Sequence, residues 1–295
     1  AGAGAAGERG WLPSLLPSLL ASAAADAAPV EAPKLSTGSL TPPLKLVTLY
    51  QYEVCPFCNK VKAVLDYLKV PYKVVEVNPL TKEELKWSTE YKKVPVVVVD
   101  GVQVNDSTEI ISQLAAAAMD VDGGKKKKGG WFGQGRAAAA AEAAAVEEEA
   151  KWRKWVDAWF VHALTPNIYR TPGEAKQAFD YITENGNFGF WTREAARWSG
   201  AASMFIISKA VLKRRHGIEN EREALYSACE EWVAAVGPNR PFLGGDRPNL
   251  ADLSVFGVLR AVRTMDTFRD VMQHTSIGPW FYRMDAAVGE STRLA

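Results

Sequence analysis

Two cysteines separated by two residues constrain the fold of this chain more than any other feature, because they mark the change from a strand pattern to a helix pattern. Residues 44–50 alternate apolar and polar side chains, and apolar residues recur at helical spacing over 61–68. A thiol at a helix N-terminus lies beside free backbone N–H groups and the positive end of the helix dipole, which lower its pKa. Cys55 is therefore predicted to be a nucleophile, and Cys58, in the first helical turn, its resolving thiol.

The same pair of cysteines could instead form half of a zinc site. The only other cysteine, Cys229, stands alone in a helical pattern, and the three histidines, His162, His216 and His274, are not spaced as a ligand pair. A redox or nucleophilic thiol is favoured for this reason, and no metal is predicted.

Length and composition limit the classes of protein to consider. A chain of 295 residues is long enough for about two domains. Its 47% hydrophobic and 23% charged residues are ordinary for a globular protein, and a net charge of +1 gives no indication of a nucleic-acid partner or an anionic membrane. A reactive thiol requires a reducing compartment.

The first 43 residues are predicted to be a disordered leader and linker. Residues 11–28 are apolar but contain prolines and serines, and their apolar part is shorter than the ~20 residues of a membrane span. We expect a targeting remnant for a chloroplast or mitochondrion, with the cytosol as the alternative, and at most weak peripheral contact with a membrane. Residues 30–43, rich in Pro, Ser and Thr, are typical of a linker.

A first domain is predicted over residues 44–119. Strands are expected at 71–77, 93–99 and 102–104, with a charged helical segment at 82–87. A helix should then begin with Asp106 or Ser107 as its N-cap.

Residues 120–150 are predicted to connect this domain to a second, all-helical domain over 151–295. The connection begins with glycines and four consecutive lysines and continues as an Ala/Glu-rich run of high helix propensity. In the second domain, tryptophans recur at helical spacing from Trp152 to Trp159, as expected of core residues. Helices are predicted over 172–184, 190–216, 219–236 and 250–262, the last with Asn249 and Asp252 as a capping box.

The order of elements in the first domain resembles the thioredoxin superfamily, with Pro95 in the place of its cis-proline. A cis bond there turns the Val94 backbone toward the thiol, where an extended peptide such as glutathione can pair with it. Asp106 and Ser107 could present N–H groups and a hydroxyl to a ligand carboxylate, although N-capping alone explains the same two residues.

A thioredoxin-like domain followed by a helical domain containing FLGG and PNLADL resembles the glutathione transferase fold. Longer motifs, among them CPFC, PYKVVEVNP, YRTP and ACEEWVAAVG, are similar to the membrane-associated prostaglandin E synthase type 2 family. This resemblance implies Cys55 as catalytic thiol, Tyr52 as its supporting tyrosine and Cys58 as the second cysteine. It implies a glutathione site at Phe57, Val94, Pro95, Asp106 and Ser107.

The resemblance also implies haem held through the glutathione thiol, with two arginines on the haem propionates. These positions fall on Ala210 and Arg214, so one of the two contacts is missing and the expectation of haem is weakened.

The function implied is isomerisation of a lipid endoperoxide, prostaglandin H2 to E2, by Cys55. The alternatives are a glutaredoxin-like thiol–disulfide oxidoreductase or peroxidase and a non-catalytic binding or scaffold subunit. Transferase folds commonly dimerise, so a homodimer is expected, and no nucleic-acid partner.

Overall fold

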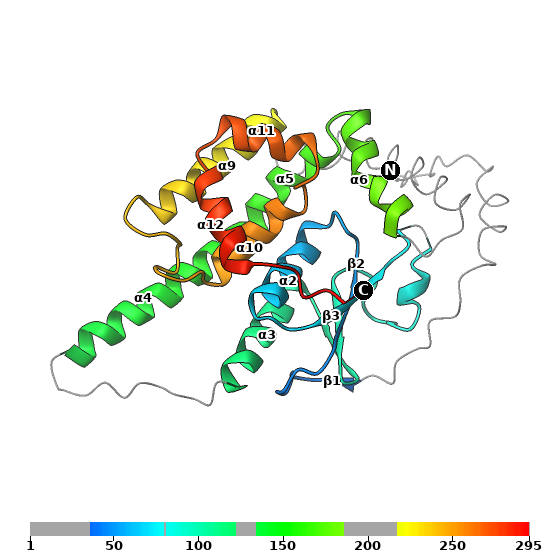
Figure 1. The fold of residues 1–295 in the computed structure, drawn as a ribbon, viewed down its shortest axis with the longest axis horizontal. Coiled ribbons are helices and arrows are strands. Elements are labelled where there is room, and N and C mark those ends of the chain that lie inside the picture. The colour runs from blue at the N-terminus through cyan, green and yellow to red at the C-terminus, as the bar shows by residue number, and fades with distance from the viewer. Residues whose placement is uncertain (1–35, 80, 122–133, 186–216, 295) are drawn as a thin grey trace, which may run out of the picture.

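The computed structural model describes residues 36–79, 81–121, 134–185 and 217–294. A mixed sheet with its helices forms one part, and a bundle of helices packs beside it (Figure 1). This arrangement agrees with the predicted thioredoxin-like plus all-helical architecture.

The sheet has five strands in the order β1-β5-β4-β2-β3. Strands β2 and β3 are parallel, with the helix between them completing a βαβ unit, whereas β4 is antiparallel to β2 and to β5. The strands are β1 (Ser36–Thr37), β2 (Val47–Gln51), β3 (Tyr72–Glu76), β4 (Val96–Val99) and β5 (Val102–Asn105).

Both faces of the sheet are covered, which explains why all four valines of β4 are buried. Successive side chains of a strand point to opposite faces. Val97 and Val99 pack in the main core with residues of α2 (Pro56–Tyr67) and α3 (Ser107–Val121). Val96 and Val98 pack on the other face, beside the short 3-10 helix η1 (Glu83–Leu85).

The helical part surrounds a core that contains three tryptophans from distant elements. The Trp232 ring lies edge-on to Trp152 at 5.6 Å and to Trp280 at 5.3 Å between centroids. The helices are α4 (Gln134–Trp155), the π-helical turn η2 (Val156–Phe160), α5 (Val161–Ile168), α6 (Pro172–Asn185), α9 (Glu221–Val236), α10 (Leu250–Arg260), α11 (Asp266–His274) and α12 (Gly278–Val288).

Three of the four predicted helices of this region are confirmed with small changes of boundary, as α6, α9 and α10. The fourth, over residues 190–216, lies outside the described residues. The predicted capping box is also present, because the Asn249 side chain accepts the Asp252 N–H while the Asp252 carboxylate accepts the Asn249 N–H.

The two parts of the molecule meet where α10 lies directly against α2. A Cβ atom on Gly257 would lie 2.6 Å from the Asn59 carbonyl oxygen and 2.6 Å from the Lys60 Cα. Only glycine permits this close approach of two helix backbones. At the far end of the same contact, Arg260 forms an ion pair of 2.7 Å with the buried carboxylate of Asp66. The helical part therefore fixes the position of the helix that begins beside Cys55.

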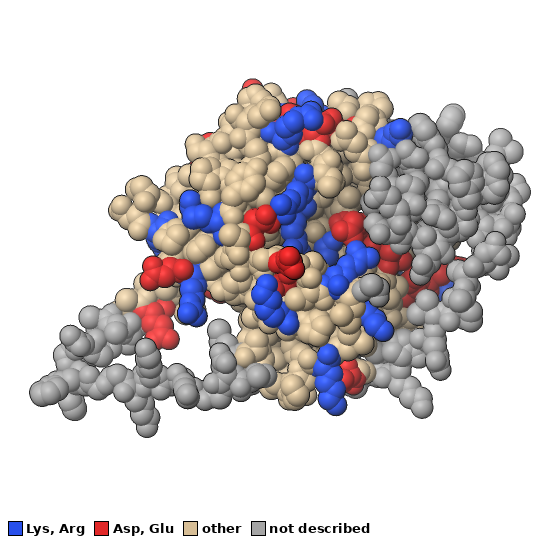
Figure 2. All heavy atoms as spheres, viewed as in Figure 1, with Lys and Arg blue, Asp and Glu red and all other residues tan. Residues whose placement is uncertain are grey.

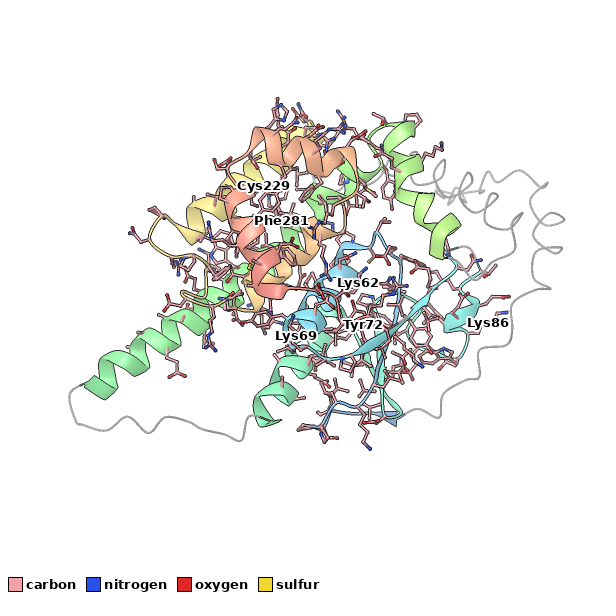
Figure 3. All side chains as sticks on the ribbon, in the orientation of Figure 1. Lys62, Lys69, Tyr72, Lys86, Cys229 and Phe281 are labelled. Atoms are coloured by element: carbon pink, nitrogen blue, oxygen red, sulfur yellow. The ribbon has the colours of Figure 1, made fainter. Side chains whose placement is uncertain are left out.

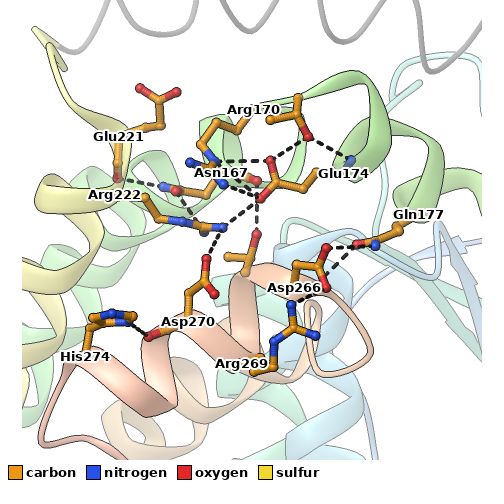
Figure 4. Close-up of polar contacts among 12 residues, drawn as sticks. Asn167, Arg170, Glu174, Gln177, Glu221, Arg222, Asp266, Arg269, Asp270 and His274 are labelled. Atoms are coloured by element: carbon orange, nitrogen blue, oxygen red, sulfur yellow. Dashed lines mark hydrogen bonds and ion pairs between the residues drawn. The ribbon is translucent and has the colours of Figure 1, made fainter.

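A buried polar network joins four segments of the helical part (Figure 4). The Arg222 guanidinium donates to Glu174 at 2.7 Å and to Asn167 at 3.1 Å, and it forms an ion pair with Asp270 at 2.9 Å. Arg170 also bonds Glu174, at 3.1 Å. Burying a charge is tolerated when it is paired and hydrogen-bonded in this way.

The last residues of the chain run along the β3 edge of the sheet, close to the marked C-terminus in Figure 1. The Tyr72 N–H donates to the Thr292 carbonyl at 3.3 Å, and the Leu294 N–H donates to the Tyr72 carbonyl at 2.8 Å. Asp66 accepts the Thr292 N–H at 2.9 Å. The C-terminal segment thereby protects an otherwise open strand edge.

Several sequence expectations require correction. The segment at 82–87 is a single 3-10 turn, and Lys82 before it adopts a left-handed conformation with φ 50° that interrupts a regular helix. The strand expected at 93–99 begins only at Val96. Pro95, just before it, has no N–H to donate to a ladder.

The predicted segment boundaries also differ from the structure. Residues 36–37, within the expected disordered linker, form β1, and the Leu40 N–H donates to Gln113 at 3.0 Å. The division between residues 150 and 151 falls inside α4, so the Ala/Glu-rich run and the first tryptophans belong to one helix. The glycine and lysine run before it lies outside the described residues.

Charged side chains lie on much of the described surface in view. Positive and negative side chains are interspersed over the face shown in Figure 2. None of the helices in the described ranges is long and apolar enough to cross a membrane.

Candidate active site

Cys55 occupies the N-cap position of α2, with extended backbone angles of φ −73° and ψ 118°. Its N–H donates to the Tyr52 carbonyl at 3.0 Å, and its own carbonyl accepts the Asn59 N–H at 3.0 Å. Pro56 follows as the first helical residue, where its missing N–H is no loss. Cys55 is partly exposed and Cys58 is fully buried. The structure thus gives the two thiols different access to a reactant.

The two thiols also differ in acidity. A hydrogen bond from the Cys58 thiol, the backbone N–H groups of Cys58 and Phe57 and the charge of Lys62 together lower the pKa of Cys55, although its burial opposes them. Burial and the neighbouring Cys55 sulfur raise the pKa of Cys58. The thiolate therefore forms at Cys55, the more accessible sulfur.

The peptide bond between Val94 and Pro95 is cis, as predicted. Among the hydrogen bonds recorded for the described residues, none uses the Val94 backbone. Its N–H and C=O are therefore free to pair with an extended ligand.

Asp106 and Ser107 lie at the start of α3. Asp106 has a positive φ of 68°, and its carboxylate accepts the Thr108 N–H at 2.8 Å and the Glu109 N–H at 3.4 Å. Ser107 is 4% exposed. The Asp106 side chain thus caps the helix, which is the interpretation that involved no ligand in the sequence analysis.

Tyr52 and Phe57 flank the thiol in sequence and are both partly buried. Burial and the nearby Cys55 and Cys58 raise the pKa of Tyr52, so its phenol stays protonated at neutral pH. The structure records no hydrogen bond between the Tyr52 hydroxyl and the Cys55 sulfur. Tyr52 is therefore a neighbouring O–H group rather than an established partner of the thiol in this state.

Two further tyrosines near the thiols were not predicted from the sequence. Tyr169 follows α5 in the helical part and is 8% exposed, and its pKa is raised by burial and then by Cys55 and Tyr52. The pKa of Tyr91 is also raised, by burial first and in part by Asp106 and both thiols. Their distance along the chain from Cys55 gave no signal of this proximity.

A cluster of polar side chains beneath the thiol turn was also missed. Glu53 forms an ion pair with Lys62 at 2.7 Å, and its backbone N–H donates to Glu76 at 2.8 Å. The Gln51 amide donates to Glu53 at 2.7 Å and to Glu76 at 3.2 Å. Figure 3 shows Lys62 on α2 where this helix lies beside the helical part.

The predicted haem contacts are not described by the structure, because Ala210 and Arg214 both lie outside the described residues. Within the described ranges, no group of His, Cys, Asp and Glu side chains is arranged to hold a metal ion.

Comparison with known proteins agrees with the fold. Residues 49–121 match the family model of the glutathione S-transferase N-terminal domain. The solved structure of glutathione S-transferase-I bound with lactoylglutathione superposes with a TM-score of 0.50 at 14% identity, over 82% of this chain and 96% of that one. Glutaredoxin 1 of Rickettsia felis is 37% identical over 65 residues, which are 21% of this chain and 64% of that protein.

These observations define a glutathione transferase-like protein with a glutaredoxin-type thiol pair at the start of its first long helix, a fold that suggests glutathione binding in general. Prostaglandin E synthase 2 of Danio rerio is 46% identical over 271 residues, which cover 83% of this chain and 71% of that protein. The chain belongs to the prostaglandin E synthase 2 family.

Proposed function

We propose that this chain isomerises the lipid endoperoxide prostaglandin H2 to prostaglandin E2 at Cys55. The observation that supports this most is the asymmetry of the thiol pair, in which the accessible cysteine has the lowered pKa and the buried one the raised pKa. The thiolate is the reactive form of a cysteine. Family membership supplies the class of substrate.

The reaction balances without any external oxidant or reductant. The Cys55 thiolate attacks one peroxide oxygen, so that an S–O bond forms, the O–O bond breaks and the other oxygen leaves as an alkoxide. A base then removes the hydrogen of the carbon that bears the S–O oxygen, the C–H electrons form the ketone, and the S–O bond breaks to return the thiolate. The alkoxide takes a proton and becomes the alcohol.

Tyr52 is proposed to stabilise the developing alkoxide by donating its phenolic O–H. Its raised pKa suits this role, because a neutral phenol at physiological pH is a hydrogen-bond donor. Tyr169 is a second phenol held close to Cys55 and Tyr52, and it comes from the opposite part of the molecule. The substrate would then lie between the two parts.

Glutathione is the proposed cofactor, and when bound it would supply a second thiol beside Cys55. The free backbone groups of Val94, after which the chain turns at the cis bond to Pro95, fit the backbone of an extended peptide. Phe57 would contact the ligand, and the N–H groups at Asp106 and Ser107, together with the Ser107 hydroxyl, would receive its carboxylate at the start of α3. Haem, a homodimer, weak membrane contact and an organellar location stay predictions.

The test is turnover of prostaglandin H2 by the purified protein with a thiol reductant, compared with Cys55→Ser. Cys229→Ala is the matched control, since Cys229 is fully buried among the helices and its pKa is raised. We expect formation of the E2 isomer to fall to the spontaneous background in Cys55→Ser and to persist in the control. Equal turnover by both variants would remove Cys55 from the reaction.

A second candidate is glutathione-dependent disulfide reduction, which the similarity to Glutaredoxin 1 favours. Reduction of a small disulfide with glutathione should be measured on the same samples. Disulfide reduction without isomerisation would assign the chain to the oxidoreductases. Absence of both activities, with the fold intact, would favour a binding or scaffold subunit.

A further inference from the structure

Beneath the turn that carries Cys55 lies a cluster of side chains to which neither the family resemblance nor the proposed reaction gives a role. Glu76 ends β3 and lies opposite Gln51 at the end of the neighbouring parallel strand β2. The chain leaving β2 forms the turn to Cys55. Glu76 is therefore placed at the edge of the sheet from which the thiol turn emerges.

Hydrogen bonds connect Glu76 to the backbone on either side of the thiol. Its Oε1 accepts the Glu53 N–H at 2.8 Å. The Glu53 carbonyl in turn accepts the Asn59 side-chain amide at 2.7 Å, and the same amide donates to the Cys55 carbonyl at 3.1 Å. A chain of three bonds thus joins Glu76 to the residue that bears the nucleophile.

The cluster contains more acceptors than donors. Two carboxylates share the single Gln51 amide nitrogen, and the Gln51 Oε1 atom is buried without a hydrogen-bond partner. Glu53 forms ion pairs with Lys62 at 2.7 Å and with Arg293 at 3.5 Å. None of the ion pairs recorded for the described residues includes Glu76. A proton on Glu76 would remove one of the two like charges.

We propose that Glu76 is a positioning residue, which holds the Cys55 turn in its reactive shape and makes the reactivity of Cys55 depend on the charge of this cluster. The inference requires Cys55 to be the reactive thiol but does not depend on the lipid substrate.

The acidity of the groups around Glu76 agrees with this role. Burial, and then repulsion from Glu53, raise the pKa of Glu76 to about 7, although hydrogen bonds and Lys62 oppose them. The titratable and charged groups that face it are Glu53 and Tyr52 from the turn, Lys62 from α2 and, through Glu53, Arg293 from the C-terminal segment. The cluster therefore changes charge in the neutral range.

Electrostatics determines whether the charge of Glu76 raises or lowers the reactivity of Cys55. Lys62 lowers the pKa of Cys55, and it is shared with the carboxylates of the cluster. When Glu76 loses its proton, the added negative charge opposes formation of the thiolate. The reactivity of Cys55 should accordingly rise less steeply between pH 6 and 8 than a single thiol titration predicts. At pH 8 one nearby negative charge should lower that reactivity by roughly a few-fold.

The test is the rate of alkylation of Cys55 by iodoacetamide between pH 5 and 9, followed by peptide mass spectrometry without any substrate. Glu76→Gln keeps an acceptor for the Glu53 N–H but cannot titrate, and Glu76→Ala removes both properties. Glu223→Gln, an exposed acid on α9, is the matched control.

We expect Glu76→Gln to follow a single titration with a rate at pH 8 a few-fold above wild type. Glu76→Ala should alkylate more slowly at every pH because the turn has lost its support, and the control should match wild type. A wild-type profile in Glu76→Gln would overturn the proposal, even if Glu76→Ala fails to fold. Since no lipid or glutathione is present, this result would leave the proposed isomerase activity to be judged by its own test.

Discussion

The close contact between α10 and α2 predicts that Gly257→Ala destabilises the protein. The new Cβ atom would meet the Asn59 carbonyl oxygen and the Lys60 Cα at 2.6 Å, and the Lys60 nitrogen at 2.8 Å. All three are backbone atoms of a helix, so no side-chain rotation can relieve the overlap. The two helices must move apart instead.

The size of the effect is a balance of two opposing contributions. Overpacking a well-packed site costs about 1–3 kcal/mol, and three backbone contacts below normal distance place this site near ~3 kcal/mol. Alanine in place of glycine inside a helix returns about 1 kcal/mol. The expected net loss is about 2 kcal/mol, which corresponds to a fall in Tm of roughly 4–8 °C for a folded unit of this size.

The matched control is Gly173→Ala in α6, where the nearest atom to the new Cβ is the Thr171 hydroxyl oxygen at 3.8 Å. Thermal unfolding followed by circular dichroism should show a lower Tm for Gly257→Ala and an unchanged or slightly higher Tm for the control. If Gly257→Ala were as stable as Gly173→Ala, the two helices would not be in backbone contact and the reasoning would fail.

Three further predictions concern charged groups. Glu76→Gln should be more stable than wild type at pH 8, by about 1–3 kcal/mol in denaturant unfolding. The pKa of Glu76 is about 7 in the folded state and lower in the unfolded state, so wild type loses stability as the pH rises from the lower value to the higher one. A difference between variant and wild type that is no larger at pH 8 than at pH 5 would contradict this prediction. Asp66→Asn should weaken the Arg260 ion pair and speed amide exchange at Thr292, and unchanged exchange would show that the C-terminal segment is held without this carboxylate. Arg222→Leu should cost about 3 kcal/mol in the same unfolding assay, because its buried glutamate partner loses a cation, and a neutral result would mean that the network of Figure 4 adds little stability.

The sequence specified the fold class because its signals are local. Periodicity along the chain alone indicates the strand before Cys55, the helix after it and the strand β4. The Asn249 capping box required only residues three positions apart. The charged segment at 82–87 was wrongly predicted to be helical, since it forms a single 3-10 turn that is preceded by the left-handed Lys82.

The sequence also specified the residues next to the thiol, but not those that reach it from elsewhere. Cys55, Cys58 and the cis-proline lie in short motifs whose chemistry depends on neighbours in the chain. Tyr169 and Glu76 approach Cys55 only because α5 packs against the α/β part and because β3 pairs in register with β2. Neither residue is unusual in its own stretch of sequence.

The sequence by itself determined the order of elements, the thiol pair and the family, because these depend on spacing along the chain. Tertiary structure alone decided which carboxylate forms no ion pair, which tyrosines from distant segments lie near the thiols and which glycine permits the two helices to touch. Burial, pKa and close packing are properties of atoms brought together from distant parts of the chain, and they are fixed only when the chain has folded.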